Sequence, residues 1–265
     1  MAINEENVCK EPSGLSKDCE QKNGGKRPSS KKEEKEIIAI EEVGKVALDT
    51  SQLKKDYDEL QPVLKEGVKQ LKRGMEDFVD AHPELAIFSW KACTKEWTSF
   101  LNKALRKEGV TNENAFTMIT DVLRGRFVTW FVDQIKPIVD LIEKVFPNFL
   151  IREHVDYLST PKEETGYYGY HLVGEYIING KASVMCEIQI RSFLGHGYSE
   201  VEHVVRYKPI FGEIDGEVKK LMDEQFKIAS EGIRAAELAF VKIYHAVQLG
   251  SAPTKIFPPR EEREE

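Results

Sequence analysis

The sequence predicts an α+β fold, with a mixed β-sheet flanked by helices. Apolar residues recur at helical spacing from Leu53 to about Asp80. The same spacing returns near the C-terminal end, over about 195–208 and about 213–247. Between these outer helices lie short β-rich segments and shorter helical ones. This order of elements implies a mixed sheet with helices packed around it.

Between the outer helices, the pattern predicts the elements one after another. A second helix covers Lys95 to Lys107 and ends near Gly109, because glycine commonly follows a helix. An apolar strand broken by charges follows at 122–131. A helix over 135–146 and a strand over 149–157 complete this middle part.

The next segment predicts a β-hairpin. Residues 168–179 and 182–190 are β-rich and meet at Asn179-Gly180, a strong turn signal. The second arm alternates, so that one face is apolar and the other polar. The apolar face carries Val184, Cys186, Ile188 and Ile190, and the polar face carries Met185, Glu187, Gln189 and Arg191.

Length and composition indicate one domain with polar tails. The chain has 265 residues, and its apolar fraction of 41% is sufficient for a normal core. The domain is expected over 50–250, with a disordered tail at 1–36 and a polar tail at 251–265. No apolar run approaches the ~20 residues of a membrane helix. The polar N-terminus does not resemble a secretory signal.

Charge and cysteine usage narrow the function further. The net charge is −7, which disfavours bulk nucleic-acid binding but leaves room for a local basic pocket that holds a polyphosphate. The four cysteines show no short paired spacing, which argues against a zinc ribbon or a disulfide framework. We therefore expect a cytoplasmic protein in a reducing compartment.

Two strand segments carry carboxylates together with cations. Glu187, Gln189 and Arg191 share one face of a strand, and Asp121 precedes a strand that carries Arg124 and Arg126. Carboxylates on neighbouring strands can share Mg²⁺, while arginines face phosphates. Asp121 and Glu187 are thus candidate metal ligands. The alternative is a solvated sheet face with an N-cap aspartate and two surface arginines.

A loop and two helices add further candidates. The loop 161–171 carries lysine, glycine and tyrosines, which suit a polyphosphate and a stacked base, although a Tyr-rich turn packed on the core is the alternative. Lys95, Ser99 and Lys103 form one helical stripe, which taken alone is more typical of a solvated face. His196, Glu200, His203 and Tyr207 share another stripe, which favours a polar network beside a nucleotide pocket over a transition-metal site.

In this order, the segments resemble the synthetase domain of the RelA/SpoT family of alarmone synthetases. The resemblance covers roughly residues 90–210, and its middle three motifs are together highly specific. The chain shows no hydrolase-type His-Asp domain before them and thus looks like a small stand-alone synthetase. The matching positions are Lys95, Ser99 and Lys103; Asp121 and Arg126; Asp156-Tyr157 to His171; Glu187 to Arg191; and Glu202-His203 to Lys208.

The resemblance implies a nucleotidyltransferase-like synthetase fold. It also implies transfer of a pyrophosphate group from ATP to the 3′-hydroxyl of GDP or GTP, with Mg²⁺. It assigns metal binding to Asp121 and Glu187, and catalysis to these two residues with Gln189. The phosphates of ATP would be held by Lys95, Ser99, Lys103, Arg124 and Arg126. The acceptor nucleotide would contact Lys162, Tyr167, His171, Arg191, His203 and Lys208, with Tyr167 stacked on the base.

The chain departs from the family pattern in three places. Cys93 stands where the family has an arginine linked to adenine stacking, with Lys91 nearby, and Arg124 stands where it has a strand glycine. The loop that follows Pro161 is one residue longer. Two alternatives therefore remain: a toxin-like pyrophosphokinase that acts on adenosine nucleotides or tRNA, and a catalytically dead nucleotide-binding regulator. A homo-oligomer, formed through the C-terminal helix, is compatible with either function.

Overall fold

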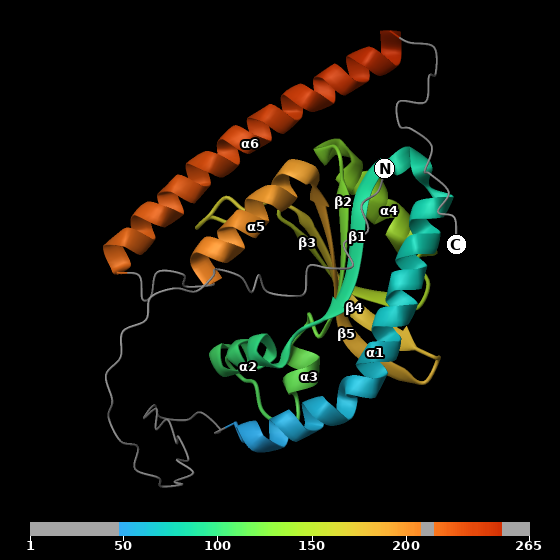
Figure 1. Cartoon of the computed structure of the whole chain (residues 1–265), viewed down its shortest axis with the longest axis vertical. Coiled ribbons are helices and arrows are strands. Elements are labelled where there is room, and N and C mark those ends of the chain that lie inside the picture. The colour runs from blue at the N-terminus through green and yellow to red at the C-terminus, as the bar shows by residue number, and fades with distance from the viewer. Residues whose placement is uncertain (1–47, 208–214, 251–265) are drawn as a thin grey trace, which may run out of the picture. The chain divides into compact units, whose positions relative to one another are not determined.

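The computed structural model describes residues 48–207 and 215–250. It confirms the predicted α+β fold, with a mixed sheet flanked by helices (Figure 1). The predicted tails at 1–36 and 251–265 lie outside the described residues, as does Lys208.

Five strands form one sheet in the order β1-β2-β5-β4-β3. The central pair, β2 and β5, is parallel, whereas β1–β2, β5–β4 and β4–β3 are antiparallel. Polar side chains of the two parallel strands therefore lie side by side in the middle of the sheet. The strands are β1 (Ile87–Thr94), β2 (Leu123–Thr129), β3 (Phe149–Asp156), β4 (Tyr170–Ile178) and β5 (Ala182–Ser192).

Helices lie on both faces of the sheet (Figure 1). The N-terminal helix (Thr50–Ala81) and the helix Ile135–Val145 cover one face of the sheet. The helix Phe193–Tyr207, which follows β5, lies over the other face. The helices are α1 (Thr50–Ala81), α2 (Trp97–Arg106), α3 (Ala115–Met118), α4 (Ile135–Val145), α5 (Phe193–Tyr207) and α6 (Gly216–Gly250), with the 3₁₀ turns η1 (Pro83–Leu85) and η2 (Val132–Gln134).

The core lies between α1, α4 and the apolar face of the sheet. Asp49 starts α1 by accepting hydrogen bonds from the backbone N–H groups of Ser51 and Gln52, each at 3.0 Å. The inward stripe of α1, which includes Leu64 and Leu71, is fully buried. It packs in one cluster with the apolar side chains of β2, β4 and β5.

The hairpin prediction is confirmed. Asn179 and Gly180 have φ angles of 53° and 66°, the left-handed conformation that a two-residue hairpin turn requires. The strand β5 alternates as expected, because Val184, Cys186 and Ile188 are buried and the residues between them are more exposed. The polar face of β5 is therefore free to carry a site.

The predicted order of elements was wrong in one respect, because it omitted β1. The segment Ile87–Thr94 pairs only with β2, at the edge of the sheet. Only Ser89 in it is buried, and the other seven residues are of intermediate exposure on both faces. The strand therefore shows no alternation of apolar and polar residues that would identify it.

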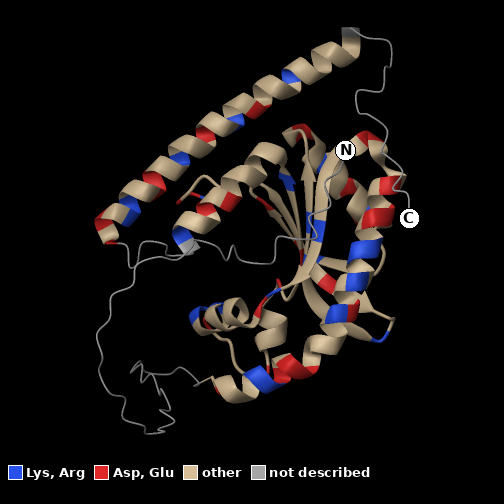
Figure 2. Ribbon diagram, viewed as in Figure 1, with Lys and Arg blue, Asp and Glu red and all other residues tan. Residues whose placement is uncertain are grey.

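The C-terminal helix α6 is largely exposed. Its charged residues, like those of α1, mix both signs, although the C-terminal end of α6 carries none (Figure 2). Apolar side chains such as Leu221, Ile228 and Phe240 are also exposed, as at a surface that binds a second copy. The homo-oligomer stays a prediction. None of the helices within the described ranges has an apolar stretch long enough to span a bilayer.

Gly174 in β4 offers a test of this packing. A Cβ atom there would lie 2.1 Å from the carbonyl oxygen of Leu150, beside the irregularity in β3 after Ile151. We expect Gly174→Ala to lower the free energy of unfolding by about 3 kcal/mol, because backbone cannot yield as a side chain does. Thermal unfolding measures this.

The matched control is Gly232→Ala. Gly232 lies within α6, and a Cβ atom there would meet nothing within 4 Å. Alanine at this position should leave stability unchanged or raise it by up to about 1 kcal/mol, since alanine is the better helix former. Equal melting temperatures for both variants would contradict the close approach of β3 to Gly174.

Candidate functional site

The parallel pairing of β2 with β5 assembles the polar face of the sheet. In this register, Arg124 lies beside Glu187 and Arg126 lies beside Gln189. Phe127 and Ile188, which point to the opposite face, are fully buried in the core. Side chains from two predicted motifs, far apart in sequence, are therefore neighbours on one surface.

A chain of polar contacts runs along this face. Gln189 Nε2 donates to Glu187 Oε1 at 2.5 Å, and Arg191 Nη2 donates to Gln189 Oε1 at 2.7 Å. His171 of β4 brings Nδ1 within 3.6 Å of Glu187 Oε1, and its Nε2 lies 2.6 Å from the hydroxyl of Tyr167. Each group fixes the rotamer of the next, so that the face is held in place before any ligand binds.

The loop 157–169, between β3 and β4, closes one side of this face. It begins where Asp156 Oδ1 accepts hydrogen bonds from the backbone N–H groups of Leu158 and Ser159, each at 3.0 Å. Tyr167 is only 4% exposed. Lys162 Nζ and Arg191 Cζ lie 5.0 Å and 5.3 Å from the centre of its ring. A base that stacks on Tyr167 must therefore displace one of these cations.

Asp121, which lies just before β2, forms ion pairs with Lys95 and Lys103. Its Oδ2 accepts a hydrogen bond from Lys95 Nζ and its Oδ1 one from Lys103 Nζ, both at 2.8 Å. The backbone of Lys95 is fixed in turn by the Tyr57 hydroxyl of α1, which donates to the Lys95 carbonyl oxygen at 2.5 Å. The pair of lysines leaves a local excess of positive charge, which suits phosphates.

Burial and neighbouring charges shift the pKa values of Asp121 and Lys95 in opposite directions. Burial alone would raise the pKa of Asp121, but Lys95 and Lys103 outweigh burial and hold that pKa below its ordinary value. Burial lowers the pKa of Lys95, an effect that Asp121 only partly offsets. Burial also lowers the pKa of His171 to about 3, with help from Arg191 and other nearby cations. His171 is therefore neutral near pH 7.

The helix α5 contributes a second polar cluster. Glu200 Oε1 accepts a hydrogen bond from Arg126 Nη1 at 2.8 Å and lies 3.9 Å from Arg191 Nη1. His196 Nδ1 lies 3.4 Å from the same Arg126 atom, and burial lowers the pKa of His196 to about 4. These contacts place the predicted polar network at the edge of the sheet face.

Ser99, Arg124 and His203 were also predicted as site residues. Ser99 is exposed on α2, and Arg124 donates to the Thr94 carbonyl oxygen at 3.2 Å. His203 is exposed on α5, where Glu202 rather than His203 is buried. The roles assigned to Ser99 and His203 therefore stay predictions.

The expected Mg²⁺ site is judged by its donor set. No group of three or more His, Cys, Asp or Glu residues that could hold a metal ion occurs within residues 48–207 and 215–250. Asp121 and Glu187 nevertheless fit this ion, because Mg²⁺ commonly takes one or two carboxylates and completes its shell with water and substrate phosphates.

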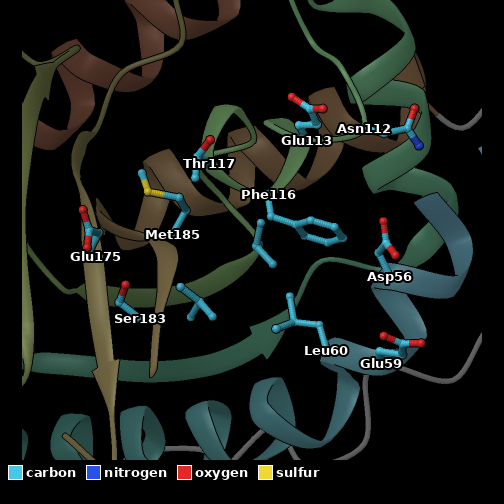
Figure 3. Close-up of a pocket in the computed structure, with 12 residues that line it drawn as sticks. Asp56, Glu59, Leu60, Asn112, Glu113, Phe116, Thr117, Glu175, Ser183 and Met185 are labelled. Carbon is cyan, nitrogen blue, oxygen red and sulfur yellow. The ribbon is translucent and has the colours of Figure 1, made fainter. Parts of the chain in front are cut away.

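One hollow lies at the end of the sheet, next to Met185 rather than beside Glu187, Gln189 and Arg191. It measures about 690 Å³ and contains none of the predicted residues (Figure 3). Its rim carries Asp56, Glu59, Glu113 and Glu175 and no lysine or arginine, so that it would repel a polyphosphate. We therefore place the candidate nucleotide site on the polar face of the sheet.

Sequence reasoning missed the contacts that hold the loop from behind. Ser230 and Glu237 of α6 are buried, and Ser230 contacts the loop directly. Their signal in the sequence is weak, because polar residues in a long helix normally face solvent.

Comparison with known proteins agrees with this geometry. Residues 92–210 match a family model described as a region found in RelA / SpoT proteins. GTP pyrophosphokinase YjbM of Bacillus subtilis (strain 168) is 29% identical over 161 residues, which cover 60% of this chain and 73% of that protein.

Solved structures show the same likeness. The small alarmone synthetase 1 from Bacillus subtilis, bound to its product pppGpp, matches with a TM-score of 0.63 and 25% identity, over 73% of this chain and 99% of that chain. A GTP pyrophosphokinase family protein from Streptococcus pneumoniae shares the fold, with a TM-score of 0.64 and 24% identity over 77% and 98% of the two chains. Residues 92–210 thus match the region found in RelA / SpoT proteins, and the chain is similar in sequence and structure to the small alarmone synthetases.

Proposed function

We propose that this protein is an ATP-dependent pyrophosphokinase that transfers the β,γ-pyrophosphate of ATP to the 3′-hydroxyl of GDP or GTP. One observation carries the proposal. The register of β2 with β5 sets Arg124 and Arg126 directly beside Glu187 and Gln189. Carboxylates beside cations, on a face braced by a buried core, are what a site that binds two polyphosphates and a metal ion requires.

The two ends of this face divide the two substrates. Lys95 and Lys103, both held on Asp121, bind the phosphates of ATP together with Arg126. Lys162, from the loop 157–169, and Arg191 bind the acceptor nucleotide, since both cations lie about 5 Å from the centre of the Tyr167 ring. Cations within one cluster must spread over both substrates, because each substrate brings several negative charges.

Transfer joins the 3′-oxygen of the acceptor to the β-phosphorus of ATP and breaks the bond between that phosphorus and the oxygen bridging to the α-phosphate. AMP leaves with this oxygen. Glu187 accepts the proton of the hydroxyl, since neutral His171, with a pKa of about 3, is a weak base. Mg²⁺, held by Asp121 and Glu187, would neutralise charge on the phosphates. Gln189 orients Glu187.

A product assay tests the proposal. The protein is mixed with γ-labelled ATP and Mg²⁺, and GDP, GTP, ADP, AMP and deacylated tRNA are offered separately. The γ-phosphate travels within the pyrophosphate, so we expect label in the guanosine product. Label found only in an adenosine product or in tRNA would overturn the choice of acceptor. Absence of transfer to every acceptor would favour the dead regulator.

Substitution of Glu187 tests the assigned carboxylate. We expect Glu187→Gln to lower kcat at least about 100-fold while the fold is kept, because an amide cannot accept the proton or hold the metal ion. The matched control is Glu175→Gln on the neighbouring strand, where Glu175 pairs with Arg152 at 3.0 Å. This control should stay within about twofold of the native rate. Near-normal transfer by Glu187→Gln would refute the assignment.

The buried histidine predicts how stability depends on pH. His171 stays neutral in the folded protein down to a pKa of about 3, whereas an unfolded chain protonates it near 6.5. Below pH 6.5 the unfolded state therefore binds one more proton than the folded state. The free energy of unfolding falls by up to about 1.4 kcal/mol for each unit by which the pH is lowered. Melting temperatures measured from pH 7 to 5 should fall less steeply for His171→Asn. Parallel curves for the two proteins would contradict this.

A further inference from the structure

The contact between α6 and the rest of the domain includes aromatic pairs, such as Tyr244 with Phe131, and two buried polar side chains. Among the described side chains of α6, only Ser230 and Glu237 are almost fully buried, at 1% and 3% exposure. A helix that merely covers a domain buries apolar side chains, because an unpaired polar group costs free energy when it leaves water. These two residues must therefore have specific partners.

The partners of α6 lie in the loop 157–169. Ser230 Oγ donates to the Gly166 carbonyl oxygen at 2.5 Å, and Arg234 Nη2 donates to the Leu158 carbonyl oxygen at 3.4 Å. From α5, the Tyr198 hydroxyl donates to the Thr165 carbonyl oxygen at 2.5 Å. Both ends of the loop that carries Lys162 and Tyr167 are thus tied to the C-terminal helices.

Gly166 shows how closely α6 approaches this loop. Its φ angle is +73°, and a Cβ atom there would lie 2.9 Å from Ser230 Cβ. Gly166 is followed directly by Tyr167, whose ring faces the site. The conformation that delivers Tyr167 to the site is therefore set against Ser230.

Glu237 lies beside Tyr168, at the same end of the loop as Gly166. Burial raises the pKa of Glu237, and Ser192, Tyr168 and the backbone N–H of Gly195 only partly offset this. None of these groups gives either carboxylate oxygen a hydrogen bond of ordinary geometry. The Arg234 guanidinium lies 5.7 Å from the centre of the Tyr168 ring and adds charge nearby. The loop (Tyr168), the end of β5 (Ser192) and the start of α5 (Gly195) thus lie around the Glu237 side chain.

We propose that α6 is a clamp that holds the loop 157–169 in its acceptor-binding shape, with Ser230 and Glu237 as positioning residues. This inference rests on the proposed function, since it takes the loop to bind the acceptor. α6 lies outside the matched family region, which ends at residue 210. A loop that is ordered before binding costs the acceptor less entropy, so that loss of the clamp weakens acceptor binding and leaves the donor side intact.

The test is Ser230→Ala, which removes one hydroxyl from the clamp. We expect the acceptor KM to rise about three- to tenfold, as loss of one hydrogen bond predicts, with the ATP KM and kcat within about twofold. The control is Glu231→Ala, the exposed neighbour on α6, which should change none of the three. An unchanged acceptor KM, or an equal rise of both KM values, would overturn the clamp.

Amide hydrogen exchange gives a second readout that does not depend on turnover. Peptides from the loop 157–169 should exchange several-fold faster in Ser230→Ala, while peptides from α2 should not change. Faster exchange of the loop supports the clamp even where the native protein transfers pyrophosphate to no acceptor, which would refute the proposed function alone. Equal exchange of the loop in both proteins would overturn the clamp.

Discussion

The parallel pairing of β2 with β5 is the constraint on which the remaining structure depends. Parallel strands at the centre of a sheet are normally buried on both faces. Here the core under α1 and α4 buries one face, and α5 lies over the other. The strand β5 alternates between core and surface, with Ile188 buried beneath Glu187 and Gln189. Because a slip of one residue would exchange the two faces, burial of the core also fixes which side chains meet on the polar face.

The polar face works in an acidic protein because its charges are local. The net charge of the chain is −7, yet Lys95 and Lys103 converge on one carboxylate, and Arg126 and Arg191 lie near another, Glu200. Lys95 and Asp121 are both buried, so that salt screens their ion pair less than it screens a surface pair. The pairs hold the cations in place when no phosphate is present, and such preorganisation limits the reorganisation that binding requires.

The sequence predicted those parts of the fold whose signals are local. The helix α1 and the Asn179-Gly180 hairpin follow from spacing and turn chemistry alone. The strand β1 was not predicted, because an edge strand that is half-exposed on both faces has no periodic pattern of apolar residues. The contact of Lys95 with Asp121 spans 26 residues and depends on the pairing of β1 with β2, which no local pattern encodes. The motifs named the site residues, but only the register shows which of them touch.

The loop 157–169 shows why a site cannot be equated with its motifs. Lys162 and Tyr167 lie inside the matched region, but Ser230, which contacts the residue before Tyr167, lies beyond its end. Polar residues in a helix look alike in sequence whether they face water or a loop. Burial separates the two cases, because only a group with a partner can leave water at little cost. This side of the candidate site is therefore built jointly by residues of the matched region and by α6.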